Sequence, residues 1–154
     1  MPDVLIVDDD PRVRALLQLS LLTNGYTVRE ACDGFEALLE VAQQRPDAMV
    51  MDLSMPRIGG FEMLDAMFER GLTQDMRIVV HTSEDDPSNV ERAAALGIAE
   101  YFLKPVDPEV LVDAIGEHLV AEEGDPLSDP LATVTLLKRH QPTPVVTDPA
   151  AAAL

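Results

Sequence analysis

The sequence predicts an α/β fold in which five parallel strands and five helices alternate as a doubly wound (βα)5 sheet. Two observations predict it. Short apolar runs alternate with segments of helical period over the first 121 residues, which is the pattern of a parallel sheet covered by helices. The runs Val4–Val7 and Ile78–Val80 are apolar throughout, as expected of strands that are buried on both faces.

The ten elements follow one another in a regular order. The strands are expected in the apolar runs, at Asp3–Asp8, Tyr26–Ala31, Ala48–Asp52, Arg77–Thr82 and Glu100–Leu103. The helices are expected between and after them, at residues 11–23, 34–44, 60–70, 87–96 and 108–121. Each strand is therefore followed by one helix, which favours parallel pairing of the strands.

Local signals support the ends of these helices. Three helices begin with an Asp-Pro pair, in which the aspartate can cap free amides and the proline takes the first helical position: Asp10-Pro11, Asp86-Pro87 and Asp107-Pro108. Asp33 and Glu36 have the spacing of a capping box at the start of the second helix. Glycines follow the first, third and fourth helices, where a left-handed residue commonly ends a helix: Gly25, Gly71 and Gly97.

Composition limits the class of protein. The formal net charge is −17, from 28 acidic residues against 11 Lys and Arg. Such a chain repels a polyanion, so we expect no direct nucleic-acid binding. The sequence contains neither a run of about 18 apolar residues nor an N-terminal signal peptide, so we expect a cytoplasmic protein without membrane contact. Cys32 is the only cysteine, which excludes an internal disulfide and a thiolate-rich metal site.

The character of the sequence changes near residue 122. One domain is expected over residues 1–121, and residues 122–154 form an extension rich in proline and alanine. Within this extension, Leu127, Leu131, Val134 and Leu137 are spaced by four, three and three residues, which could place them on one face of a short helix near 127–138. A loosely ordered tail is the simpler interpretation, and a docking or dimerising arm is the alternative.

Charged and polar side chains follow the expected strands at their carboxyl ends. Asp8 and Asp9 close the first strand, Asp52 the third and Thr82 the fourth, and Lys104 follows the fifth. An open α/β sheet forms its binding crevice at this edge. Carboxylates gathered there would repel one another, so the site should raise a pKa or recruit a cation. Oxygen ligands without His or Cys favour Mg²⁺.

Asp52 is the best candidate for a nucleophile. It closes an apolar strand and is followed by a loop that begins Leu53-Ser54. A carboxylate beside a metal can attack phosphorus and form an acyl phosphate. Phosphoryl transfer depends on positioning and charge neutralisation, which the metal, the Lys104 ammonium and the Thr82 hydroxyl would supply. Ser83 also carries a hydroxyl that could serve, and strand alternation sends the two hydroxyls to opposite faces, so the residues alone leave this choice open.

Four segments occur in a characteristic order: VLIVDDD, MVMDLSMPRIGGFEML, IVVHTSE and YFLKPV. Together they resemble the receiver domain of two-component response regulators, the CheY-like family, over residues 3–121. The resemblance implies a flavodoxin-like strand order of 2-1-3-4-5. It also implies that Asp8 and Asp9 bind Mg²⁺, that Asp52 is both phosphoacceptor and metal ligand, and that the backbone carbonyl of Ser54 is a further ligand.

The same resemblance implies a switch. Thr82 matches the hydroxyl that turns toward the phosphoryl group, Lys104 matches the lysine that pairs with it, and Tyr101 matches the aromatic residue that moves inward. The Lys104–Pro105 bond is expected to be cis. Tyr101 could equally be a core aromatic residue, and His81, on the alternate face from Thr82, has no partner spacing that suggests a ligand or base.

The expected function is that of a stand-alone response regulator that catalyses only its own phosphorylation and dephosphorylation and is otherwise not an enzyme. Its expected partners are a sensor histidine kinase or phosphotransfer protein and, for output, a downstream protein; a second copy bound through the fourth helix, fifth strand and fifth helix or through the extension is the alternative.

Two departures and two alternative functions accompany this expectation. Gly59-Gly60 stands where the family often has Asp-Gly, which bears on the start of the third helix, and Ser54 and Glu84 occupy variable positions that tune dephosphorylation. One alternative is a phosphatase resembling haloacid dehalogenases with Asp8 as nucleophile, although Asp52 would then have no role. The other is a receiver-like interaction module that is not phosphorylated.

Overall fold

The structure is a computed structural model that describes residues 1–120, with the side chains of residues 117–120 left out. Five parallel strands form one sheet in the order β2-β1-β3-β4-β5, which confirms the predicted architecture and strand order. The strands are β1 (Asp3–Val7), β2 (Thr27–Ala31), β3 (Ala48–Met51), β4 (Arg77–Thr82) and β5 (Glu100–Leu103). The helices are α1 (Pro11–Thr23), α2 (Gly34–Gln43), α3 (Gly60–Glu69), α4 (Pro87–Ala95) and α5 (Pro108–Val120).

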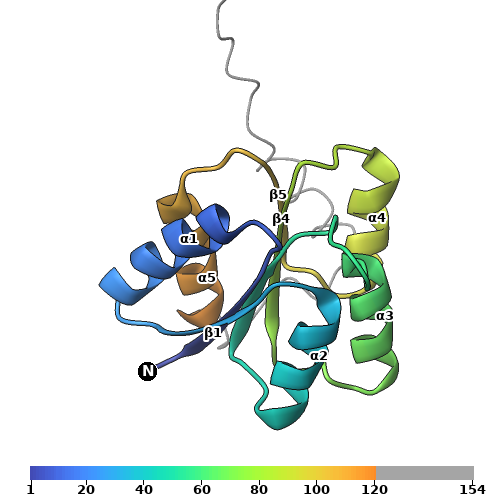
Figure 1. The fold of residues 1–154 in the computed structure, drawn as a ribbon, viewed down its shortest axis with the longest axis horizontal. Coiled ribbons are helices and arrows are strands. Elements are labelled where there is room, and N and C mark those ends of the chain that lie inside the picture. Colours follow the sequence, from blue (N-terminus) through green and yellow to red (C-terminus); the bar gives the residue numbers. More distant parts are fainter. Residues whose placement is uncertain (121–154) are drawn as a thin grey trace, which may run out of the picture.

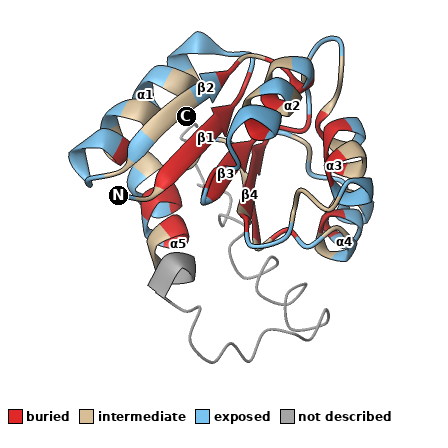
Figure 2. Ribbon diagram, turned by 90° about the horizontal axis from the view of Figure 1, so that it is seen from below, coloured by how far each residue is buried: buried red, intermediate tan, exposed pale blue. Residues whose placement is uncertain are grey.

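Helices cover both faces of the sheet, with α1 and α5 on one face and α2, α3 and α4 on the other (Figure 1). Every residue of β1 and β3 is buried, and β1, β3 and β4 form the buried centre of Figure 2. Because side chains alternate along a strand, β1 sends Val4 and Ile6 into the core beneath α1 and α5. It sends Leu5 and Val7 into the core beneath the other three helices.

The register of the sheet brings the carboxyl ends of the central strands to one edge. Val7 pairs with Met51, and Met51 pairs with Val80. The backbone ladder continues for one residue beyond β1, β3 and β5. The amide of Asp8 donates to the carbonyl of Ala31 at 3.2 Å, the amide of Asp52 to the carbonyl of Val7 at 2.9 Å, and the amide of Lys104 to the carbonyl of Thr82 at 2.7 Å. Asp52 and Lys104 are therefore held by the sheet itself.

The helix caps agree with the sequence signals, with one change of detail. The carboxylates of Asp10, Asp86 and Asp107 each accept a hydrogen bond of 2.9 Å from an amide two residues later. Asp33 accepts from the amide of Glu36 at 2.9 Å, but the Glu36 carboxylate accepts from the amide of Cys32 rather than from that of Asp33. The three glycines that follow helices all have positive φ, as predicted: Gly25, Gly71 and Gly97.

The structure corrects three strand boundaries by one residue each. β1 ends at Val7 rather than at Asp8, and β3 ends at Met51 rather than at Asp52. Tyr26 was expected in the second strand, but β2 begins at Thr27, because the amide of Tyr26 donates to the carbonyl of Leu21 at 3.0 Å and closes the end of α1. The expected extension over 122–154, with its helix near 127–138, lies outside the described residues. Within the described part of the chain, no helix combines the length and the apolar character needed to cross a membrane.

Candidate functional site

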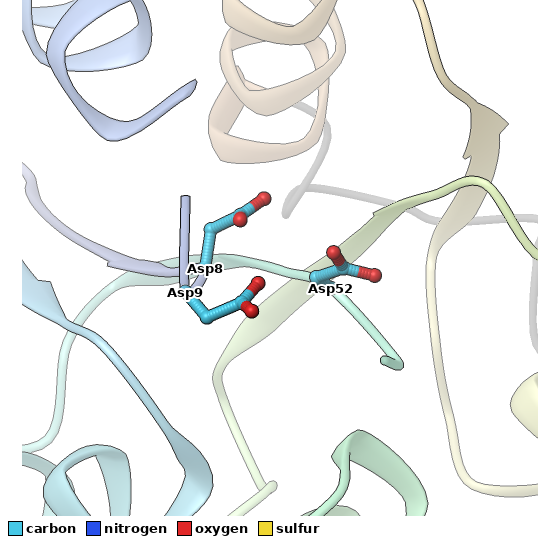
Figure 3. Close-up of side chains that lie close together, drawn as sticks. All are labelled: Asp8, Asp9 and Asp52. Atoms are coloured by element: carbon cyan, nitrogen blue, oxygen red, sulfur yellow. The ribbon is translucent and has the colours of Figure 1, made fainter. Parts of the chain in front are cut away.

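Three carboxylates converge at the carboxyl edge of the sheet. Asp8 and Asp9 follow β1 and Asp52 follows β3, and one oxygen of each lies within 4.8 Å of the others. Figure 3 shows the Asp8 and Asp9 side chains next to each other, with their carboxylates directed toward the side on which Asp52 lies. Asp8 and Asp52 are buried, whereas Asp9 is exposed. The cluster is therefore buried at Asp8 and Asp52 and open to solvent at Asp9.

Lys104 supplies the positive charge of this cluster. Its Nζ donates to Oδ2 of Asp8 and to Oδ2 of Asp52, both at 2.8 Å. The Lys104–Pro105 peptide bond is cis, as the resemblance implied. Burial lowers the pKa of Lys104, but the hydrogen bonds to the two carboxylates outweigh it, so that the pKa is raised above its ordinary value. Lys104 is therefore firmly protonated.

The Asp8 carboxyl group lies in an unfavourable place for a negative charge. Burial is the largest cause that raises its pKa, and the charge of Asp52 acts in the same direction. The hydrogen bonds from Lys104 and from the amide of Asp10 oppose this effect only in part, and the pKa of Asp8 is raised above its ordinary value. One ammonium does not compensate the clustered carboxylates, and a hard divalent cation fits this set of oxygen donors.

The loop after Asp52 holds the second oxygen of its carboxylate. The amide of Ser54 donates to Oδ1 of Asp52 at 3.1 Å. Gly60, at the start of α3, packs directly behind this loop, since a Cβ on Gly60 would lie 2.7 Å from the carbonyl oxygen of Asp52. The Gly59-Gly60 pair was expected to bear only on the start of the helix. The structure shows that its second glycine also lets α3 approach the Asp52 loop.

The two candidate hydroxyls at the end of β4 differ in burial. Thr82 is fully buried, and its hydroxyl accepts from the amide of Glu84 at 3.3 Å, whereas Ser83 is exposed. Tyr101 is also fully buried, and its hydroxyl donates to the carbonyl of Glu84 at 2.6 Å. Burial raises the pKa of Tyr101, and the charge of Glu84 adds to this effect. Thr82 and Tyr101 are thus both bonded to the backbone of Glu84.

The Glu84 side chain joins two further elements. The hydroxyl of Ser54 donates to one of its carboxylate oxygens, and the side-chain amide of Asn89, in α4, donates to the other at 3.0 Å. A continuous set of hydrogen bonds therefore runs from the loop after Asp52 to α4 and, through the Glu84 carbonyl, to Tyr101 in β5. The sequence placed Ser54 and Glu84 at variable positions but did not predict that they touch.

Two more features near the site escaped the sequence analysis. Arg57, which has a positive φ of 66°, forms an ion pair with Asp33 and so ties the loop after β3 to the start of α2. His81 is only 6% exposed, and neither ring nitrogen has a hydrogen-bond partner among the described residues. Strand alternation predicted the face to which His81 points. It could not predict burial, which depends on how α1 packs.

The fold and the site together define an acidic crevice at the carboxyl edge of a doubly wound parallel sheet. The sequence matches the family of the response regulator receiver domain over residues 4–116. Because this match covers most of the chain, the protein belongs to the response regulator receiver family of two-component systems. Members of this family are signalling proteins rather than classical enzymes, and they generally bind Mg²⁺ at an acidic pocket.

Curated relatives agree with this assignment. The chain is 45% identical to the response regulator MprA of Mycobacterium tuberculosis over 111 residues, which is 71% of this chain and 46% of that protein. It is 41% identical to MprA of Mycobacterium leprae over 131 residues, 84% of this chain and 56% of the relative. The chain therefore spans about half the length of the curated relatives it matches.

Solved structures show the same fold. The chemotaxis response regulator CheY4 of Vibrio cholerae superposes with a TM-score of 0.70 at 32% identity, over 76% of this chain and 98% of CheY4. A CheY-like receiver domain protein from Methanospirillum hungatei gives a TM-score of 0.75 at 27% identity, over 80% of this chain and 97% of the other. The likeness extends over nearly the whole of both solved chains.

Proposed function

We propose that this chain accepts a phosphoryl group on Asp52 in a Mg²⁺-dependent reaction and signals by changing its interactions with other proteins. One observation supports this proposal above all. The carboxylates of Asp8, Asp9 and Asp52 converge within 4.8 Å, and Lys104 lies 2.8 Å from two of them. This arrangement has the charges that a bound phosphoryl group and its metal require.

Asp52 is the nucleophile in this proposal. Its Oδ1 accepts from the Ser54 amide and its Oδ2 accepts from Lys104, so the carboxylate is held in one orientation. One carboxylate oxygen forms a bond to phosphorus while the bond from phosphorus to the donor breaks, and the donor leaves with that electron pair. Lys104 and the hydroxyl of Thr82 would then neutralise and bind the phosphoryl oxygens.

The acidic residues would hold the cation. The carboxylates of Asp8, Asp9 and Asp52 fit a hard divalent ion by their chemistry, and the backbone carbonyl of Ser54 is the fourth proposed ligand. When bound, Mg²⁺ would supply charge neutralisation for the phosphoryl oxygens. The exposed side of the cluster, at Asp9, would admit both the ion and the phosphodonor.

Family membership supports a proposal for the kind of phosphodonor and for the kind of protein interaction that phosphorylation changes. Receiver domains act with histidine kinases and downstream targets, so we propose a histidine kinase or phosphotransfer protein as donor. We propose that phosphorylation changes the surface of α4, β5 and α5, where a second copy or a target protein binds. The hydrogen bonds from Ser54 through Glu84 to Asn89 and Tyr101 support this route.

The lack of nucleic-acid binding is proposed for this chain of 154 residues alone, on the basis of its net charge of −17. Burial does not separate Asp52 from Asp8, the nucleophile of the alternative phosphatase, since the two are 4% and 2% exposed and both oxygens of each accept hydrogen bonds. The match to the response regulator receiver family over residues 4–116 favours Asp52.

The proposal is tested with acetyl phosphate and with beryllofluoride, each with Mg²⁺. The wild-type chain should gain one phosphoryl mass, labile to hydroxylamine, and Asp52→Asn should not. Asp85→Asn, at an exposed aspartate outside the cluster, is the matched control and should behave as the wild type. Adduct formation in Asp52→Asn would refute the assignment of the phosphoacceptor. No adduct and no beryllofluoride binding in the wild type would favour the interaction module that is not phosphorylated.

A further inference from the structure

A pocket of about 170 Å³ lies on the side of the sheet that α1 and α5 cover, next to the acidic site. Its walls are formed by α1, the end of β4 and the segment after β5, through Val13, Leu16, Leu17, His81, Lys104 and Val106. The lining is apolar apart from His81 and Lys104. The proposed phosphoryl transfer uses Lys104, but it assigns no role to this space or to His81.

The pocket wall contains a buried polar side chain, His81, without a hydrogen-bond partner among the described residues. The residue is 6% exposed, and it lines the pocket with both ring nitrogens free of partners among the described residues. A buried polar group without a hydrogen bond is costly, and such groups in native structures usually have a partner. The imidazole therefore offers a hydrogen-bonding point in an otherwise apolar wall.

The charge state of His81 limits what it can bind. Burial lowers the pKa of His81 to about 4, and the nearby charge of Lys104 adds to this effect. The ring is therefore neutral at pH 7, with one nitrogen that donates and one that accepts. Lys104 is already occupied by Asp8 and Asp52. An ionised ligand would lose its hydration in an apolar pocket without gaining a free counter-charge.

We propose that this pocket binds a small, neutral and mostly apolar molecule that carries one hydroxyl group, with the hydroxyl bonded to His81. The volume sets the size. An apolar cavity of about 150 Å³ holds one benzene molecule, so a pocket of about 170 Å³ takes a single substituted ring or an aliphatic alcohol of similar bulk. A molecule of this size should bind with a dissociation constant on the order of 1 mM.

Two probes of almost equal shape test the proposal. 4-Methylphenol and toluene differ only by the hydroxyl, and each is titrated into the full, unphosphorylated chain while the methyl resonances of Val13, Leu16 and Leu17 are followed by NMR. 4-Methylphenol should shift these resonances and bind about fivefold more tightly than toluene, the factor expected of one hydrogen bond. His81→Leu should abolish this preference.

Variants on the exposed side of α1 provide an independent arm. Leu16 lines the pocket and is 58% exposed, so Leu16→Trp places bulk at its mouth with little risk to folding. It should weaken both probes by about tenfold. Leu19→Trp, at a leucine of the same helix that is 66% exposed and does not line the pocket, is the matched control and should bind as the wild type.

Three results would overturn the proposal. They are equal binding of the two probes to the wild type, an unchanged preference for 4-methylphenol in a folded His81→Leu variant, and shifts that Leu16→Trp and Leu19→Trp affect alike. If His81→Leu fails to fold, the comparison of the two tryptophan variants still decides whether the pocket is the binding site. The test uses the unphosphorylated chain, so its outcome does not depend on the proposed phosphorylation of Asp52.

Discussion

Lys104 and Asp52 are joined by a hydrogen bond of 2.8 Å although 52 residues separate them in the sequence. The same ammonium also holds Asp8, which is 96 residues away. One cation thus links the ends of β1, β3 and β5 across the carboxyl edge of the sheet. This link couples the stability of the fold to the charges of the site.

Removal of this ammonium should destabilise the metal-free chain. Lys104→Met leaves two buried carboxylates without their partner, and since the lysine itself is 21% exposed, we expect a loss of about 2 kcal/mol in the free energy of unfolding. Added Mg²⁺ should recover part of this loss, because it replaces the lost positive charge. Urea denaturation with and without Mg²⁺ measures both effects. Arg12→Met, at an exposed arginine, changes the net charge equally and should have little effect; equal losses in the two variants would contradict the prediction.

Mg²⁺ binding should weaken as the pH falls. The raised pKa of Asp8 means that the folded metal-free chain holds this proton more tightly than the unfolded chain, so the contribution of Asp8 to stability falls as the pH rises through its folded pKa. A bound cation stabilises the ionised Asp8 carboxylate, so the cation competes with the proton for this group. Calorimetric titrations at several pH values should show affinity rising with pH above the ordinary pKa of 3.8.

Asp8→Asn provides the matching stability test. In EDTA at pH 7, this variant should melt roughly 2 to 4 °C above the wild type, because it removes a penalised charge. With Mg²⁺ at ten times its dissociation constant, the wild type should gain about 1.4 kcal/mol and the variant much less. Asp85→Asn should show the wild-type gain. A full Mg²⁺ response in Asp8→Asn would exclude Asp8 from the ligands.

His81 should make the protein sensitive to mild acid. Its pKa falls from 6.5 to about 4 on folding, so the unfolded chain binds more protons between these values and stability decreases as the pH is lowered through this range. The loss should approach about 3 kcal/mol. His81→Leu should remove most of this dependence, as measured by urea denaturation at pH 7 and pH 4.5. The same slope in both proteins would show that other groups cause it.

The two glycines before α3 should respond oppositely to substitution. Gly59 caps the helix without a side-chain hydrogen bond, and a Cβ there has no neighbour closer than 3.7 Å. Gly59→Ser creates a capping box with Glu62 and should stabilise the chain by about 0.5 kcal/mol. Gly60→Ser places its Cβ 2.7 Å from the Asp52 carbonyl and should destabilise it by about 2 kcal/mol. Thermal unfolding of both variants measures the difference.

The sequence was sufficient for most of the fold, because its signals are local. The apolar runs of β1 and β4 and the Asp-Pro starts of α1, α4 and α5 need no knowledge of distant contacts. The start of β2 was wrong by one residue. β2 is an edge strand with exposed residues, so its apolar pattern is weak, and the backbone bond from Tyr26 to Leu21 decides the boundary.

For the candidate site, the sequence predicted which residues lie close together but not their detailed contacts. Parallel strands place their carboxyl ends at one edge, so the meeting of Asp8, Asp52 and Lys104 follows from topology alone. The bond between Ser54 and Glu84 and the burial of His81 depend on the paths of loops and on helix packing. The periodic pattern of apolar residues in the sequence does not predict these contacts or this burial. The roles of the grouped residues in phosphoryl transfer stay predictions.

His81 faces the pocket beside α1, while its neighbour Thr82 lies on the other side of the sheet next to the backbone of Glu84. Insertion or deletion of one residue within β4 would exchange these directions, because side chains alternate along a strand. An imidazole would then replace the hydroxyl beside the backbone of Glu84. We therefore expect that length changes in this protein's evolution are confined to its loops and that β4 tolerates substitution but not insertion.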